Sequence, residues 1–471
     1  MSTLTPEVLH QIVKAYDIRG RVADELTPLV MRALGSATAR VLEDRHAPIA
    51  VGYDMRASSP ELAAAFCDGV RDTGRDIIDL GLVSTDMVWF ASGALMVAGA
   101  MITASHNPPS DNGLKLCRAG AKPVSITTGL AEIRDLALTP TLPVAGAAAT
   151  SPRGVMTSQD IYDRFVAHVR HASGFVEPVT FTVVVDAGNG MGGLVWPLVS
   201  EAFGIPTDPL FFALDGQFPN HPANPLEEAN LQWLRDRVVS TKAAVGFAFD
   251  GDADRVFAVD EHGEPVSASV MGAVLAQWML RSSSGATVLA NAITARCVEQ
   301  AVVGAGGQLQ RTRVGHSFIK ADMASTGAIY AVEHSGHHYF RDHFGADSGV
   351  IAAVMFLVAL ADSGLSVSEL VAPFRTGVSL GEQNFTVSDP IEAIKAVTDF
   401  WQSHAEISTL DGVTVSFPNG WLNLRPSNTE PVVRLNIEAD DAQTVAHWRT
   451  ETLRALTDAH CLHSTDGGHH A

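Results

Sequence analysis

Three segments of the 471-residue chain repeat one order of predicted elements: an apolar strand, a turn, a helical stretch and a second strand. The first runs over 49–80, the second over 181–204 and the third over 287–309. A strand followed by a helix and a returning strand is the building unit of α/β domains. Because the units are spaced by roughly a hundred residues or more, the sequence predicts three α/β domains.

The pattern changes after about Thr376. Segments 413–417 and 432–437 alternate apolar and polar residues as strands do, with a helical pattern before the first and after the second. This order predicts a smaller α+β domain. A stretch rich in Ala, Pro and Gly, 142–157, is the clearest boundary between domains. We therefore expect four domains, at 1–150, 151–262, 263–375 and 376–471.

Charge and hydropathy exclude several classes of protein. The chain has 52 acidic and 32 basic residues, a formal net charge of −20, which disfavours a nucleic-acid partner. The uncharged run 87–104 is barely long enough to span a bilayer and contains two glycines, so we interpret it as a buried helix and strand. The four cysteines form no CxxC pair, and the first residues lack the apolar core of a signal peptide. We expect a cytoplasmic protein with buried thiols, no membrane or nucleic-acid partner, and a monomeric or small homo-oligomeric state.

A serine follows this uncharged run, at the point where the chain must turn. His106, Asn107 and two prolines come directly after Ser105, and these residue types favour a turn out of the buried segment. Such a turn would present the hydroxyl at a rim, where it could act as a nucleophile. The alternative is a serine that caps a helix or strand. No GxSxG elbow is present, which weighs against a serine hydrolase.

Three aspartates at alternate positions, Asp250, Asp252 and Asp254, follow a strand-like segment. Their carboxylates would repel one another unless a cation neutralised them, and hard oxygen ligands suit Mg²⁺ or Ca²⁺. An EF-hand loop would need glycine where the chain has Arg255, and its flanks would be helices. The pattern predicts a divalent cation site, with a solvated acidic turn as the alternative.

Other polar segments offer contacts for a phosphate and a sugar. The turn 425–431 combines guanidinium, hydroxyl and amide donors, which suit a phosphate dianion, although a polar hairpin loop would look similar. Segment 333–338 suits sugar hydroxyls, and its three histidines are too crowded for an evident tetrahedral zinc site. Segment 14–20 places two cations around Tyr16, where a structural salt bridge is the default. Lys115 could return to the rim near Ser105.

A glycine-rich segment, 188–193, matches GxGxxG between a strand and a helix. This motif would suggest a dinucleotide oxidoreductase if an acidic residue about 20 positions later could hold a ribose. The only candidate is Asp208, which lies between turn-forming prolines. We interpret the segment as a tight β–α turn.

Five of these segments together resemble the signature loops of the α-D-phosphohexomutase family, and they occur in the family's order: 14–20, 103–108, 250–255, 333–337 and 425–431. The resemblance covers nearly the whole chain. It implies three related α/β domains with mixed sheets and an unlike C-terminal α+β domain, arranged around a central cleft. Glu333 is followed by histidine, which resembles the phosphomannomutase/phosphoglucomutase branch more than the acetylglucosamine branch. Val332 departs from the pattern, because the family commonly has glycine there.

The resemblance implies a role for each motif residue. Ser105 would carry a phosphoryl group, and Asp250, Asp252 and Asp254 would hold one Mg²⁺ together with an oxygen of the phosphoserine. Residues around the transferring phosphoryl group would be Arg19, Lys115, Arg255, His316 and His337, with Lys115 and His337 as general acid and base. Substrate contacts would come from Tyr16, Glu333, Ser335, Arg425, Ser427, Asn428, Thr429 and Arg434.

The implied activity is the interconversion of hexose 1-phosphates and hexose 6-phosphates of mannose and/or glucose. Hexose 1,6-bisphosphate would be its intermediate and activator. Two alternatives stay open: a phosphoglucosamine or phosphoacetylglucosamine mutase, and a sugar-phosphate binding protein without turnover.

Overall fold

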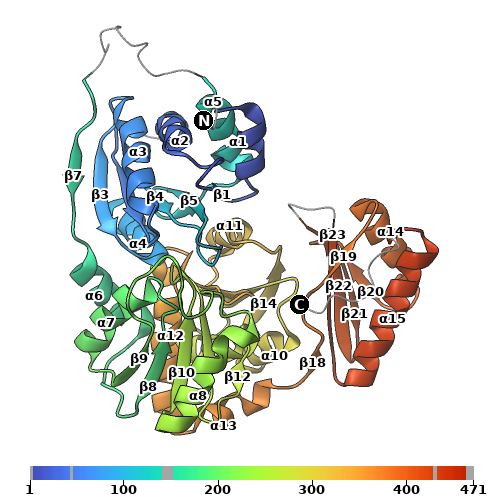
Figure 1. Cartoon of the computed structure of the whole chain (residues 1–471). Coiled ribbons are helices and arrows are strands. Elements are labelled where there is room, and N and C mark those ends of the chain that lie inside the picture. The colour runs from blue at the N-terminus through green and yellow to red at the C-terminus, as the bar shows by residue number, and fades with distance from the viewer. Residues whose placement is uncertain (1–3, 43–45, 140–151, 428–431, 463–471) are drawn as a thin grey trace.

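The computed structural model describes residues 4–42, 46–139, 152–427 and 432–462, which fold into four units, each built around one β-sheet (Figure 1). The first three units carry mixed sheets and helices, and the fourth lies apart from the first at the right of Figure 1. The predicted fold class, three α/β domains and a C-terminal α+β domain, is confirmed.

The first unit has a sheet of strand order β1-β5-β4-β2-β3-β7, with β6 paired to β5. Its elements are α1 (Pro6–Ile12), β1 (Ile18–Arg21), α2 (Pro28–Val41), β2 (Ile49–Tyr53), α3 (Ser59–Arg71), β3 (Ile77–Leu82), α4 (Thr85–Leu95), β4 (Ala98–Ile102), β5 (Asp111–Arg118), β6 (Lys122–Pro123), α5 (Ala131–Ala137) and β7 (Met156–Ser158). The uncharged run 87–104 is a buried helix and strand, as predicted. β7 pairs with β3, so this sheet extends past the predicted boundary at residue 150. All three β7 residues are exposed, which left no apolar pattern to reveal the strand.

The second and third units repeat the strand–helix–strand order. The second has α6 (Tyr162–Ser173), β8 (Val183–Asp186), α7 (Gly192–Phe203), β9 (Thr207–Leu210), α8 (Gln232–Thr241), β10 (Val245–Phe249), β11 (Val256–Val259) and β12 (Pro265–Val266). The third has α9 (Ala268–Leu280), β13 (Thr287–Asn291), α10 (Arg296–Gly304), β14 (Gln308–Thr312), α11 (His316–Thr326), β15 (Tyr330–Val332), β16 (His338–Phe340), β17 (Ala346–Asp347), α12 (Gly349–Ser363) and α13 (Val367–Val371). In both sheets parallel strands are extended by an antiparallel edge, at β11 and at β16.

The fourth unit is a meander of antiparallel strands with two helices. Its elements are β18 (Val378–Ser379), β19 (Gln383–Thr386), α14 (Pro390–Trp401), β20 (Glu406–Ser408), β21 (Val413–Phe417), β22 (Gly420–Pro426), β23 (Val432–Ala439) and α15 (Ala442–Asp458). Asp389 and Asp441 cap the two helices by accepting hydrogen bonds from backbone N–H groups of the first turn.

Apolar packing divides the molecule differently from the sheets. One continuous core joins the second and third units to α4 of the first, through residues such as Trp89, Phe247 and Phe356. The fourth unit has a core of its own, around Trp401, Leu422 and Trp448. Such a division makes the fourth unit the part that can move with least loss of apolar contact.

Two expectations from composition concern the cysteines and the bilayer. The four cysteines are buried and unpaired, as predicted. Within the described ranges, no single helix has the length and hydropathy of a membrane span; a pair bent by 98°, Gly349–Ser363 with Val367–Phe374, meets these criteria only in combination.

Candidate active site

Ser105 lies in the turn after β4, with a left-handed backbone conformation of φ 51°. The buried guanidinium of Arg56 holds this turn by donating hydrogen bonds to the carbonyl oxygens of Ser105 at 2.8 Å and Asn107 at 2.7 Å. A left-handed serine costs free energy of order 1–3 kcal/mol. The contacts around the turn therefore impose this conformation on Ser105.

The side chain of Ser105 points to the aspartate loop. Its Oγ donates a hydrogen bond to Asp250 Oδ2 at 2.6 Å, and Arg255 Nη2 lies 3.3 Å from the same Oγ. The backbones also touch, because a Cβ on Gly251 would come within 2.2 Å of the Ser105 carbonyl oxygen. The two loops that the sequence separates by 145 residues thus form one surface.

Asp250, Asp252 and Asp254 follow β10 and are buried together. Each aspartate offers one carboxylate oxygen, and these three oxygens lie within 4.8 Å of one another. The Oδ1 atoms of Asp252 and Asp254 have no hydrogen-bond partner among the described residues. Burial raises the pKa of Asp250 to about 7, with a smaller contribution from the other two carboxylates. Crowded, partly unsatisfied carboxylates of this kind fit a divalent cation.

Lys115, on β5 of the first unit, forms ion pairs with the aspartate loop. Its Nζ lies 2.6 Å from Asp252 Oδ2 and 2.5 Å from Asp254 Oδ2. Burial alone would lower the pKa of Lys115, but the carboxylates of Asp252 and Asp254 outweigh it and raise this pKa. Lys115 is therefore held in its charged form.

The glycine-rich segment 188–193 is a tight β–α turn that supports the aspartate loop, in agreement with the prediction. The N–H of Met191 donates to the carbonyl of Gly251 at 2.9 Å. A Cβ on Gly190 would meet the backbone of Gly251 at 2.7 Å, so only glycine permits this approach.

Glu333, in the polar loop that follows β15, is almost wholly buried. It accepts hydrogen bonds from Tyr339 Oη at 2.7 Å, Asn291 Nδ2 at 3.1 Å and the N–H of Gly315 at 3.1 Å. Val332, the departure from the family pattern, belongs to β15 and packs on Gly272 of α9. The side chain at this position thus lies in the core, on the side of the strand that faces α9.

Two histidines of the third unit lie at the cleft, and one of them, His337, contacts the aspartate loop. His337 Nδ1 hydrogen-bonds with Ser335 Oγ at 3.0 Å, and its Nε2 lies 3.6 Å from Asp254 Oδ1. His316 begins α11, and its burial lowers its pKa to about 3, so it is neutral near pH 7. Asp347, which belongs to no sequence motif, also lines the cleft, and its carboxylate pairs with Lys320 at 2.6 Å.

Arg19 and Tyr16 join this surface from the start of the chain. Arg19 donates from Nη1 to the carbonyl of Ala104 at 3.0 Å and to Asn107 Oδ1 at 2.7 Å. Its Nε pairs with Asp17 at 2.7 Å, which is the structural salt bridge expected for this segment. The ring of Tyr16 lies edge-on to His316, with 4.8 Å between centroids.

The fourth unit contributes a pair of arginines. Arg425 on β22 and Arg434 on β23 are partners across the sheet, and both contact Glu382, at 2.6 Å and 3.1 Å. Ser427 follows β22 and lines the same cleft. Asn428 and Thr429, the other predicted phosphate contacts, lie outside the described residues. Glu382 could not be found from sequence, because it lies 43 residues before Arg425 and belongs to no motif.

Residues from each of the four units line one cleft of about 320 Å³, which Asp254 of the aspartate loop also lines. Ser105, Lys115 and Arg255 lie at one end with the aspartate loop, and Arg425, Ser427 and Arg434 come from the fourth unit.

Four domain families match the chain in order, described as phosphoglucomutase/phosphomannomutase alpha/beta/alpha domains I, II and III and the C-terminal domain. They cover residues 10–141, 163–263, 268–376 and 382–455. The chain belongs to the phosphoglucomutase/phosphomannomutase family. The predicted family is thereby confirmed.

Full-length relatives agree with this family. The chain is 37% identical over 450 residues to a protein named phosphohexose mutases from Xanthomonas campestris, covering 94% of this chain and 98% of the relative. It is 35% identical over 463 residues to a phosphomannomutase/phosphoglucomutase of Pseudomonas aeruginosa, covering 96% of both. A crystal structure of a phosphoglucomutase/phosphomannomutase family protein from Burkholderia thailandensis superimposes with a TM-score of 0.86 at 29% identity over 99% of both chains.

Proposed function

We propose that the chain interconverts hexose 1-phosphates and hexose 6-phosphates of mannose and/or glucose, through a phosphoserine at position 105 and a hexose 1,6-bisphosphate. One observation carries the proposal. The Ser105 hydroxyl lies 2.6 Å from a buried three-carboxylate cluster, in a cleft that also contains the arginine pair of the fourth unit. Two groups that can each bind a phosphate thus share one cleft, as a substrate with two phosphorylated ends requires.

The cluster supports a proposal that Asp250, Asp252 and Asp254 hold one Mg²⁺, with an oxygen of phosphorylated Ser105 as a further ligand. Mg²⁺ bound there would offset negative charge on the phosphoryl oxygens. Arg255 adds fixed positive charge next to the Oγ of Ser105, and Lys115 adds it next to the carboxylate of Asp252. Fixed charges in a buried site stabilise a transition state without reorganisation.

Proton movement is assigned to two side chains. In the first half of the reaction the bond from phosphorus to Ser105 Oγ breaks and a bond to the sugar oxygen forms, while the sugar hydroxyl proton passes to His337. Lys115 is proposed to donate a proton to the departing serine oxygen, because its ammonium group lies 2.6 Å and 2.5 Å from two carboxylates of the loop that contacts Ser105. The second half reverses these transfers with the other phosphate of the bisphosphate.

The sugar and its remote phosphate are held by the other walls. Glu333 and Ser335 are proposed to bind sugar hydroxyls, with Tyr16 and His316 close by, and Arg425, Ser427 and Arg434 are proposed to bind the phosphate that does not react. Between the two half-reactions the bisphosphate must exchange its ends. The separate core of the fourth unit permits the displacement that such a rotation needs.

A mutase for glucosamine phosphates is the second candidate, and His334, which follows the proposed sugar-binding glutamate, favours the phosphomannomutase/phosphoglucomutase branch over it. Its ring hydrogen-bonds with Asn291 at 3.3 Å, and burial lowers its pKa to about 4, so it reaches the sugar loop as a neutral group. Comparing turnover of mannose 1-phosphate, glucose 1-phosphate and glucosamine 1-phosphate separates the candidates.

The central test is Ser105→Ala, with Ser110→Ala as the matched control, because Ser110 is exposed in the same turn region. Intact mass spectrometry should find one phosphoryl group on the wild type and on the control, and none on Ser105→Ala. Turnover should fall by at least about 10⁴-fold in Ser105→Ala alone. Full turnover in Ser105→Ala would rule out the phosphoserine mechanism.

A further inference from the structure

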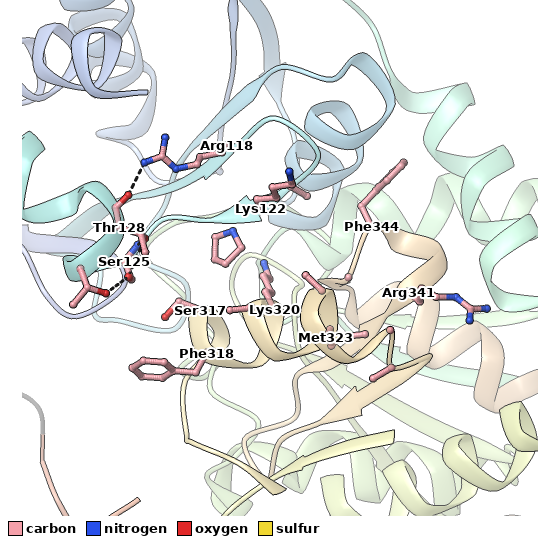
Figure 2. Close-up of a pocket in the computed structure, with 18 residues that line it drawn as sticks. Arg118, Lys122, Ser125, Thr128, Ser317, Phe318, Lys320, Met323, Arg341 and Phe344 are labelled. Atoms are coloured by element: carbon pink, nitrogen blue, oxygen red, sulfur yellow. Dashed lines mark hydrogen bonds between the residues drawn. The ribbon is translucent and has the colours of Figure 1, made fainter. Parts of the chain in front are cut away.

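A second cavity, of about 660 Å³, lies between the first and third units (Figure 2), and it shares no lining residue with the catalytic cleft. Arg118 and Lys122 lie on its first-unit side, and Ser317, Lys320 and Met323 lie on the facing helix α11 (Figure 2). The proposed reaction uses none of the residues that line it. This cavity, which we call the seam cavity, is therefore a separate site by composition and position.

Helix α11 presents a regular face to the seam cavity. Ser317, Ala321, Ala324 and Ala328 line it at intervals of three or four residues along and just beyond the helix, which is the spacing of one helical face. Small side chains on this face keep the cavity open. Pro123 and Phe344 add apolar wall from the two sides.

The charge of the lining is one-sided. Of the described residues that line the seam cavity, four are basic, namely Arg118, Lys122, Lys320 and Arg341, and none is acidic. Lys320 is paired with Asp347 and Arg341 with Asp342, both outside the lining. The whole chain has a net charge of −20, and the catalytic cleft contains acids such as Asp254 and Glu333 beside its bases. An apolar cavity whose charged lining residues, among those described, are all basic, and in which Lys122 is left without an ion pair, is complementary to an anion with an apolar body.

Two lining groups are available to such an anion. Lys122 is exposed on β6, and it forms no ion pair with another described residue. The Oγ of Ser317 is buried and has no hydrogen-bond partner among the described residues. A buried hydroxyl without a partner loses free energy that a ligand oxygen could restore.

The seam cavity shares two elements with the catalytic cleft. Helix α11 begins with His316, which lines the cleft, and continues with Ser317, which lines the seam cavity. Strand β5 carries Lys115 in the cleft and ends with Arg118 in the seam cavity. A ligand in the seam cavity would contact both elements and hold the first unit against the third.

We propose that the seam cavity binds a small organic anion that has an apolar body and at least one carboxylate, sulfonate or phosphate group. Its apolar body lies against the alanine face of α11, and its anionic group faces Lys122. The ligand stabilises the contact between the first and third units and occupies a site distinct from that of the hexose phosphates.

The test uses anilinonaphthalene sulfonate, an apolar anion whose fluorescence rises in an apolar site, and the full-length protein. Ala324→Trp fills the mouth of the cavity from an exposed position on α11, and Ser325→Trp places the same side chain on an exposed position of the same helix outside the lining. We expect Ala324→Trp to weaken binding at least about tenfold and Ser325→Trp to change it less than about twofold. Equal binding by both variants would overturn the proposal.

Charge is tested separately. Lys122→Glu should weaken binding about fivefold, whereas Lys395→Glu, an exposed lysine of the fourth unit, should leave it unchanged. Neutral anilinonaphthalene should bind the wild type more weakly than the sulfonate does. If the neutral compound bound equally well, or if sedimentation showed a dimer that Ala324→Trp dissociates, the cavity would be an apolar contact surface and the anion site would be excluded. Unchanged melting temperatures of the variants show that the differences do not come from unfolding.

Discussion

The two ends of the catalytic cleft differ in how they are built. At the end that holds Ser105, three carboxylates and Lys115 are almost wholly buried, in a region whose core joins parts of the first three units. At the other end, Arg425 and Arg434 belong to a unit with its own core, and the side chain of Arg434 is 31% exposed. We call these ends the reacting end and the remote end.

This difference matches the work that each end is proposed to do. Charges at the reacting end are fixed by burial and by each other, so they are already placed for phosphoryl transfer. Charges at the remote end need only bind a phosphate, and they must accept either end of the same intermediate. Changes at the reacting end should therefore affect kcat, and changes at the remote end should affect KM.

Apart from the loss of Ser105 itself, the largest effect is expected from Lys115→Met at the reacting end. This change leaves Asp252 and Asp254 buried without their cation, so turnover should fall about 10³-fold, and without divalent cation the free energy of unfolding should fall by about 3–5 kcal/mol. Added Mg²⁺ should restore much of the stability but not the turnover. Steady-state kinetics and thermal melting with and without Mg²⁺ measure both effects.

Lys320→Met is the matched control, because Lys320 also forms a buried ion pair, with Asp347 at 2.6 Å. It should lose stability to a similar extent that Mg²⁺ does not restore, and it should lose less turnover than Lys115→Met. If the two variants lost turnover equally, the loss would reflect a damaged fold, and the special role of the reacting end would be refuted.

Local patterns in the sequence predicted most elements and the loops of both ends. Segments 413–417 and 432–437 alternate apolar and polar residues and lie in β21 and β23. Successive side chains of a strand point to opposite faces, so burial of one face produces this alternation in the sequence. The aspartate loop was predictable for a similar reason, since three carboxylates so close in sequence must also be close in space.

Contacts between distant segments could not be predicted in this way. Arg56 holds the turn of Ser105 from 49 residues away, and Glu382 joins both arginines of the remote end. The sequence around a single arginine or glutamate does not identify the residue that it contacts in the folded chain. The seam cavity was hidden for the same reason, because its two walls come from different units.

The second prediction concerns the remote end and its two arginines. Arg425 is buried and Arg434 is partly exposed. Loss of a charged hydrogen bond to phosphate costs about 1.5–3 kcal/mol, so Arg425→Gln should raise KM for hexose phosphates about 10- to 100-fold and change kcat much less. Arg434→Gln should raise KM only about fivefold. A fall in kcat as large as the rise in KM would show that the remote end also takes part in the transition state.

The third prediction concerns the free energy of unfolding at acid pH, which should depend on a buried histidine of the third unit. His338 on β16 is fully buried, and burial lowers its pKa to about 3. In the unfolded chain this histidine takes up a proton near pH 6.5, whereas in the folded chain it does not do so until about pH 3. The free energy of unfolding therefore falls as pH decreases below about 6.5, by about 1.4 kcal/mol per pH unit from this group. Calorimetry of unfolding at pH 5 should show about one proton fewer taken up by His338→Gln than by the wild type, and equal uptake would contradict this assignment.

The smallest effect is expected from Glu382→Gln at the remote end. Glu382 accepts a hydrogen bond from Arg425 at 2.6 Å and contacts Arg434 at 3.1 Å. Burial would raise the pKa of this carboxyl, but the arginines outweigh it and lower the pKa, so Glu382 is ionised and competes with a phosphate for the same guanidinium groups. Removing the charge while keeping the hydrogen-bonding amide should lower KM about threefold, as expected for a partly solvated charge pair. Glu406→Gln, an exposed acid of the same unit, should leave KM unchanged. A higher KM in Glu382→Gln would instead mean that the carboxylate orients Arg425 for the phosphate, and the remote end would then be as closely fixed in geometry as the reacting end.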